Sequence, residues 1–136
     1  MTPATATDTT LYEAVLEQLE IRPGTRVLDV GCGPGLFLRL AADRGATVTG
    51  IDAAPQSIEL ARERLPQADL TVGDMDPLPY PDDSFDVVTA WDAFQSAADP
   101  RGALREAARV ARPGARIVIG LENAFTYLIA TTRKGA

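Results

Sequence analysis

Two aspartates stand at positions where a carboxylate could bind a polar ligand. Asp29 is embedded in a short apolar run and comes two residues before a glycine-rich turn, and Asp52 ends a second apolar run. An ionised carboxylate accepts hydrogen bonds more strongly than a neutral oxygen and also attracts cations. We interpret Asp52 as the acceptor for both hydroxyls of a ribose. The alternative is a helix N-cap, because a helical pattern follows it.

The turn itself contains Gly31, Gly33 and Gly35 at alternate positions, and a pattern with helical spacing starts at Leu36. Glycine lets a backbone turn sharply and leaves no side chain between the chain and a ligand. An apolar run, a glycine turn and a helix form the unit that holds nucleotide-like cofactors in α/β proteins. The third glycine of a dinucleotide fingerprint would stand at Leu36, and Gly35-Leu36-Phe37 does not match a phosphate-binding loop that ends in Lys-Ser/Thr.

Asp29 narrows the class of ligand further. A carboxylate beside this turn would repel a pyrophosphate but attract an ammonium group. Because an unpaired charge inside a fold is costly, Asp29 should also have a cationic or hydrogen-bond-donating partner. The expected ligand is nucleoside-like, has no phosphates and carries a positive group, a description that S-adenosyl-L-methionine fits.

Four segments occur in the order typical of the class I S-adenosylmethionine-dependent methyltransferases. They are the run 27–35, Asp52, Gly73-Asp74-Met75 and Arg112-Pro113-Gly114. Over roughly residues 11–120 the sequence resembles the small-molecule, type 11 branch of that family. The resemblance implies S-adenosyl-L-methionine as the cofactor and a small molecule as the methyl acceptor.

The resemblance also assigns further contacts to the cofactor. It implies that Asp74 accepts from the adenine amino group and that the Met75 backbone N–H meets a ring nitrogen; a simple polar turn is the alternative. Besides Asp29, Asp52 and the three glycines, the expected cofactor contacts include Cys32, Ala53, Ala90 and Trp91.

The catalytic residue remains unknown at this level, with three candidates. Tyr12 lies on a leading helix that packs against the cofactor site in the similar family, although a purely packing tyrosine is the alternative. Asp92 and Gln95 follow the fourth apolar run, where the family often has a histidine, and the neutral amide of Gln95 is unable to act as a general base.

Composition limits the possible partners. The net charge of −6 argues against a nucleic-acid partner. One cysteine and no histidine leave no internal disulfide and no expected metal site. Without an apolar leader or long apolar run, we expect no membrane span and a cytoplasmic location.

The elements predict a single α/β domain over 9–136, after a frayed tail over 1–8. We expect a Rossmann-like, doubly wound sheet with parallel strands in the order 3-2-1-4-5 and an antiparallel C-terminal strand. The leading helix should begin with a capping box between Thr10 and Glu13. The expected buried positions of that helix are Leu11, Ala14, Val15 and Leu19, with Leu16 off the face, and those of the last helix are Leu104, Ala107, Ala108 and Ala111.

The substrate-covering region that family members place before the closing strand is missing from this sequence. A non-catalytic module that binds S-adenosylmethionine or S-adenosylhomocysteine is therefore one alternative function. A nucleotide-dependent oxidoreductase is another, against which Asp29 and Leu36 argue. The uncharged tail strand within 121–132 would present an unpaired edge, so we also expect a possible homodimer through it.

Overall fold

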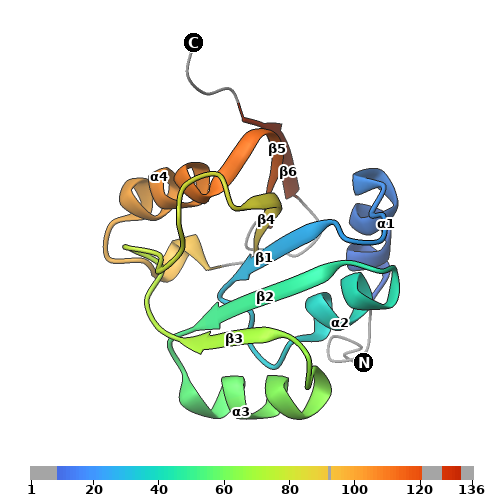
Figure 1. The fold of residues 1–136 in the computed structure, drawn as a ribbon. Helices are drawn as coiled ribbons and strands as arrows, with labels where there is room; N and C mark the ends of the chain where they lie inside the picture. Colours follow the sequence, from blue (N-terminus) through green and yellow to red (C-terminus); the bar gives the residue numbers. More distant parts are fainter. Residues whose placement is uncertain (1–8, 92, 121–126, 133–136) are drawn as a thin grey trace, which may run out of the picture.

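A six-stranded sheet with the order β3-β2-β1-β4-β5-β6 organises the chain (Figure 1). The computed structural model describes residues 9–91, 93–120 and 127–132. The strands are β1 (Arg26–Val30), β2 (Thr47–Asp52), β3 (Asp69–Val72), β4 (Phe85–Trp91), β5 (Ala111–Gly120) and β6 (Tyr127–Thr131). All neighbours pair in parallel except β5 and β6, which are antiparallel. The predicted sheet order and the antiparallel closing strand are confirmed.

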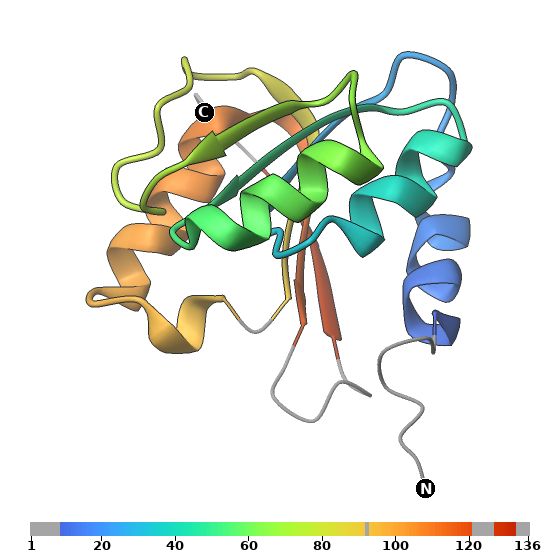
Figure 2. The same ribbon diagram turned by 90° about the horizontal axis from the view of Figure 1, so that it is seen from below.

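Helices cover both faces of this sheet. They are α1 (Thr10–Leu19), α2 (Leu36–Asp43), α3 (Pro55–Arg64) and α4 (Pro100–Val110), with a short 3-10 helix η2 (Phe94–Ser96). Figure 2 shows α1 and α4 on opposite sides of the strands. Because β1 is covered on both faces, its apolar residues need not alternate with polar ones, as its sequence indicated.

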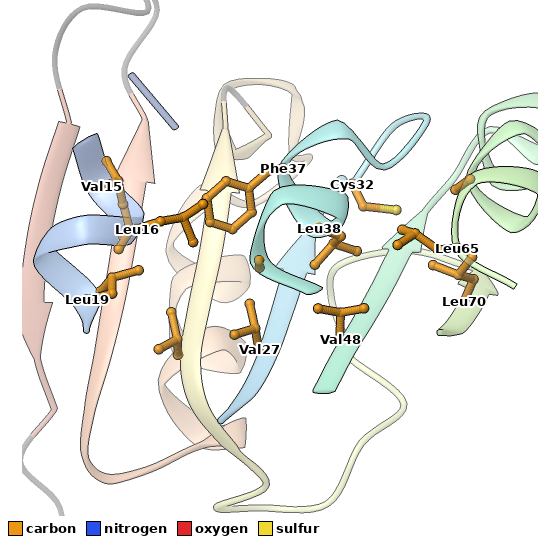
Figure 3. Close-up of a cluster of buried hydrophobic side chains, with 14 of the residues drawn as sticks. Val15, Leu16, Leu19, Val27, Cys32, Phe37, Leu38, Val48, Leu65 and Leu70 are labelled. Atoms are coloured by element: carbon orange, nitrogen blue, oxygen red, sulfur yellow. The ribbon is translucent and has the colours of Figure 1, made fainter. Parts of the chain in front are cut away.

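Two clusters of buried side chains fill the space between helices and sheet. The first joins α1, α2 and α3 to strand residues such as Val27 and Val48 (Figure 3). The second joins α4 to the next residue along each strand, for example Leu28 and Val88. Neighbouring strand residues thus serve opposite faces, which is the period-two geometry of a strand.

The prediction for the start of α1 was wrong. Thr9 is the N-cap residue and makes no side-chain capping bond. The Glu13 carboxylate instead accepts from Arg44 of the segment after α2, at 2.9 Å. Leu16 is fully buried, whereas Ala14 is exposed. The larger side chain faces the core because α1 packs against both α2 and the sheet.

The predicted inner face of α4 was confirmed at Ala107, which is fully buried, and wrong at Leu104. Leu104 is 42% exposed, and its neighbour Ala103 is buried. The reason lies at Gly102, where an added Cβ would collide with the Asp76 carboxylate. The helix therefore turns its small residues inward, and Ala111 already belongs to β5.

Within the residues that the structure describes, no helix is both long and apolar enough to cross a membrane.

Candidate functional site

A cleft of about 270 Å³ opens where the parallel strands β1, β2, β3 and β4 end. Its walls come from the carboxyl ends of these strands and from the loops that follow them. The lining residues are Val30, Gly31, Ile51, Asp52, Ala53, Gly73, Asp74, Met75, Trp91, Ala93 and Ser96. The sheet order reverses at β1, and ligands of doubly wound folds bind at this switch point.

The Asp52 carboxylate connects the two loops that border the cleft. Oδ2 accepts the Gly33 backbone N–H at 2.8 Å, and Oδ1 accepts the Ala54 backbone N–H at 2.9 Å. Asp52 is not the N-cap of α3, because that position is Ala54. Each carboxylate oxygen has a second lone pair, so Asp52 is still able to accept ligand hydroxyls.

The glycine turn adopts a backbone that other residues rarely reach. Gly31, Gly33 and Gly35 have φ values of +74°, +56° and +89°. A Cβ on Gly31 would lie 2.8 Å from the Ala93 side chain, so the loop after β4 approaches the turn through the missing side chain. A Cβ on Gly33 would meet nothing within 4 Å, which leaves open space above the turn.

Asp29 lies behind the cleft rather than on its wall. It is 2% exposed, and Thr89, its register partner on β4, donates its hydroxyl to Oδ1 at 2.8 Å. Thr89 is thus the hydrogen-bond donor that we expected for Asp29 but could not identify from the sequence. Burial raises the pKa of Asp29 to about 7, with a further upward contribution from Asp52, while the Thr89 hydrogen bond acts in the opposite direction. A ligand contact by Asp29 stays a prediction.

Asp74 and Met75 both line the cleft. The Met75 backbone N–H donates to Asp74 Oδ1 at 2.7 Å, so these two groups bond to one another. The polar-turn alternative accounts for that bond. The second carboxylate oxygen of Asp74 remains an acceptor for an amino group, and the assignment of both residues to adenine stays a prediction.

The other expected cofactor contacts divide into two groups. Ala53 and Trp91 line the cleft. Ala90 and Cys32 are buried in the core, with exposed fractions of 2% and 7%. Burial, followed by the charges of Asp29 and Asp52, raises the pKa of the Cys32 thiol to about 12. The Cys32 side chain belongs to the first buried cluster. Cofactor contacts by Ala90 and Cys32 stay predictions.

Tyr12 is not among the residues that line the cleft, but its ring packs against Trp91, which does line it. Its ring centroid lies 4.9 Å from that of Trp91 and 5.3 Å from that of Phe37. These contacts match the packing alternative for Tyr12 and hold α1 beside the cleft. Asp92 and the side chain of Gln95 lie outside the described residues, so their candidate roles stay predictions.

Three cleft residues, Gly73, Ala93 and Ser96, were not among the expected cofactor contacts, although Gly73 belongs to the Gly73-Asp74-Met75 segment. All three lie in segments that follow the carboxyl end of a strand, and this position is the sequence feature from which their place in the cleft could have been predicted. Their small or ordinary side chains carry no distinctive chemistry, so position alone would have included many other loop residues.

Residues 28–119 match the family described as a methyltransferase domain, Methyltransf_11. The chain belongs to this family. S-adenosyl-L-methionine is the cofactor of this family. The cleft fits its nucleoside part, because Asp52 and Asp74 line it and the turn at Gly33, which bonds to Asp52, leaves open space. The family match therefore favours the methyltransferase class over the alternative of a nucleotide-dependent oxidoreductase.

The 27-O-demethylrifamycin SV methyltransferase of Amycolatopsis mediterranei is 39% identical over 119 residues, which cover 82% of this chain and 44% of that protein. The chain spans less than half the length of the curated relatives compared with it.

Solved structures show the same fold. The YcgJ protein from Bacillus subtilis has a TM-score of 0.76 at 30% identity, over 82% of this chain and 50% of that one. The cyclase SpnF has a TM-score of 0.75 at 33% identity, over 80% of this chain and 43% of that one.

Proposed function

We propose that the chain transfers the methyl group of S-adenosyl-L-methionine to an oxygen, nitrogen or carbon nucleophile of a small molecule. The observation that carries this proposal is the cleft at the switch point, where Asp52 and Asp74 both line the ligand space. The cofactor supplies an activated methyl group on a sulfonium centre when bound. The similarity to a methyltransferase that acts on 27-O-demethylrifamycin SV supports a small-molecule acceptor.

The chain's own contribution would be binding and orientation. Asp52 would hold the ribose hydroxyls, and the Gly33 turn would let the ligand approach the backbone. Holding two reactants in line accounts for much of the acceleration in such transfers, so no dedicated base is required. Tyr12, Asp92 and Gln95 remain the candidates for contact with the acceptor.

A methyl-transfer assay tests this proposal. The chain would be incubated with cofactor labelled in the methyl group and with 27-O-demethylrifamycin SV or a panel of phenols, amines and carbon nucleophiles such as 1,3-dicarbonyl compounds. Label in a product supports methyl transfer. S-adenosylhomocysteine binding in calorimetry without transfer to any acceptor would favour the non-catalytic alternative.

That alternative is a module that binds S-adenosylmethionine or S-adenosylhomocysteine without methyl transfer. Two observations favour considering it. The chain spans less than half of its curated relatives. A protein 33% identical to it with the same fold is named as a 4+2 cyclase.

Asp52→Ala is expected to weaken S-adenosylhomocysteine binding by about 1.5–3 kcal/mol, the range for hydrogen bonds to a charged group. The variant removes the proposed ribose acceptor and also leaves the Gly33 and Ala54 N–H groups without this partner. Titration calorimetry measures the change. Asp74→Ala is the matched comparison, with a smaller expected loss because Asp74 would accept one amino group, whereas Asp52 would accept two ribose hydroxyls. Unchanged affinity of Asp52→Ala would remove the ribose assignment.

The homodimer through 121–132 stays a proposal, and residues 121–126 lie outside the described structure. Its support is β6, which pairs with β5 and ends the sheet order. The free side of an edge strand is a template for another chain. Light scattering at micromolar concentration should give a dimer mass that deletion of 124–136 reduces. A monomer mass unchanged by the deletion would contradict the dimer.

A further inference from the structure

A second hollow lies at the opposite end of the sheet from the cleft, beside the amino ends of β1 and β4. Its volume is about 420 Å³, larger than the 270 Å³ of the cleft. The side chains that matter for its chemistry are Arg22, Arg112, Arg116, Asp86 and Glu20. The proposed methyltransferase function uses none of them.

This hollow concentrates positive charge on an acidic chain. Three arginines and two carboxylates line it, and Arg26 adds a fourth guanidinium 3.9 Å from Asp86. Two positive charges are therefore in excess locally, although the whole chain carries −6. Such a local field attracts anions.

Asp86 organises the arginines and does not neutralise the hollow. Its Oδ1 accepts from Arg112 Nε, and its Oδ2 accepts the Arg26 backbone N–H at 2.8 Å. Burial alone would raise the pKa of Asp86, but the bonds from Arg26 and Arg112 outweigh it and hold that pKa below its usual value. The carboxylate therefore stays ionised and keeps Arg112 in place.

The guanidinium groups retain donors for a ligand. Arg116 gives one N–H to the Gln18 carbonyl at 3.0 Å, and Arg112 gives one to Asp86 and one to the Pro113 carbonyl. A guanidinium carries five N–H donors in a fork that matches phosphate oxygens. Within the described part of the chain, the Arg22 side chain makes no hydrogen bond or ion pair, and it lines the hollow.

We propose that this hollow binds a small phosphate-bearing anion of about the size of a diphosphate. Paired guanidinium forks recognise tetrahedral phosphate oxygens in bidentate fashion. The volume exceeds what one phosphate would fill, and Leu19 and Pro23 give the wall an apolar part. Since the site lies at the other end of the sheet, the proposal is independent of the methyltransferase function.

The experiment is titration calorimetry of the full chain with sodium pyrophosphate, against sodium chloride at the same ionic strength. Saturable binding of pyrophosphate with one site is expected, and chloride should give none. Arg22→Gln combined with Arg116→Gln should weaken the binding by about tenfold or more, since charge-assisted hydrogen bonds are lost. Arg101→Gln, on exposed α4 surface, is the matched control and should bind as the parent does.

Two single variants provide further tests of pyrophosphate binding at this hollow. Arg22→Gln alone should show a weaker but measurable loss, and it tests the site even if the double variant fails to fold. Arg116→Lys keeps the charge without the fork and should bind more weakly than the parent. Absence of saturable pyrophosphate binding, or equal affinity in the double variant and Arg101→Gln, would overturn the proposal.

Discussion

Asp29→Asn is expected to increase the free energy of unfolding at pH 8 and to flatten its dependence on pH. The Asp29 side chain is 2% exposed and bonds to Thr89, and its pKa is raised from 3.8 to about 7, chiefly by burial. At one pKa unit per about 1.4 kcal/mol, keeping this carboxylate ionised in the fold costs on the order of 4 kcal/mol. Asparagine keeps the acceptor oxygen for Thr89 and removes the charge.

The direction with pH follows from proton binding. Between pH 3.8 and about 7 the folded chain keeps the Asp29 proton that the unfolded chain has lost, so this group's contribution to stability falls as pH rises. The parent and Asp29→Asn should therefore differ little at pH 3.5 and most above pH 7. Urea unfolding at several pH values measures the difference.

Asp43→Asn is the control for the pH experiment, because the Asp43 side chain is 58% exposed. Its pH profile should follow that of the parent. An Asp29→Asn profile parallel to the parent's over the same range would contradict the buried, protonated state of Asp29.

Gly33→Val is expected to abolish S-adenosylhomocysteine binding. Gly33 has φ +56°, a conformation that is strained for a β-branched residue, and its missing side chain leaves open space above the turn. A valine there would occupy that space and displace the N–H that Asp52 accepts at 2.8 Å. Titration calorimetry measures the loss.

Gly24→Val is the control that shows whether Gly33→Val loses binding through backbone strain or because its side chain fills the ligand space. Gly24 has φ +88° and also meets nothing within 4 Å of an added Cβ, but it lies before β1, away from the cleft. Both variants should lose thermal stability, and only Gly33→Val should lose binding. Normal binding by a folded Gly33→Val would show that the ligand lies elsewhere.

The sequence was sufficient for the sheet order because its strongest local signals agree. Individual strands are specified by the apolar run before three glycines, by the second run that ends in Asp52 and by the β-rich tail. The right-handed crossover rule then determines the order of these strands in the sheet. Helix faces were less predictable. In α4, Leu104 has the larger apolar side chain, but Gly102 and Ala103 are buried instead, and an added Cβ on Gly102 would collide with the Asp76 carboxylate.

Several cleft-lining residues could be predicted from their positions at strand ends, whereas contacts between neighbouring strands could not; the roles of these residues toward the cofactor stay predictions. Asp52, Ala53, Asp74 and Met75 line the cleft because strand ends meet at one edge of the sheet. Thr89 pairs with Asp29 only through the register between β1 and β4, which no sequence spacing reveals. Cys32 has a cleft-forming sequence position, yet its side chain points into the core.

The aromatic cluster gives the molecule an optical reporter at its cleft. Trp91 is the chain's only tryptophan, it lines the cleft, and its ring centroid lies 4.9 Å from that of Tyr12. All indole emission therefore originates at one wall of the ligand space, with a tyrosine close enough to pass excitation to it. The unlabelled chain carries its own fluorophore for following occupancy of the cleft in real time.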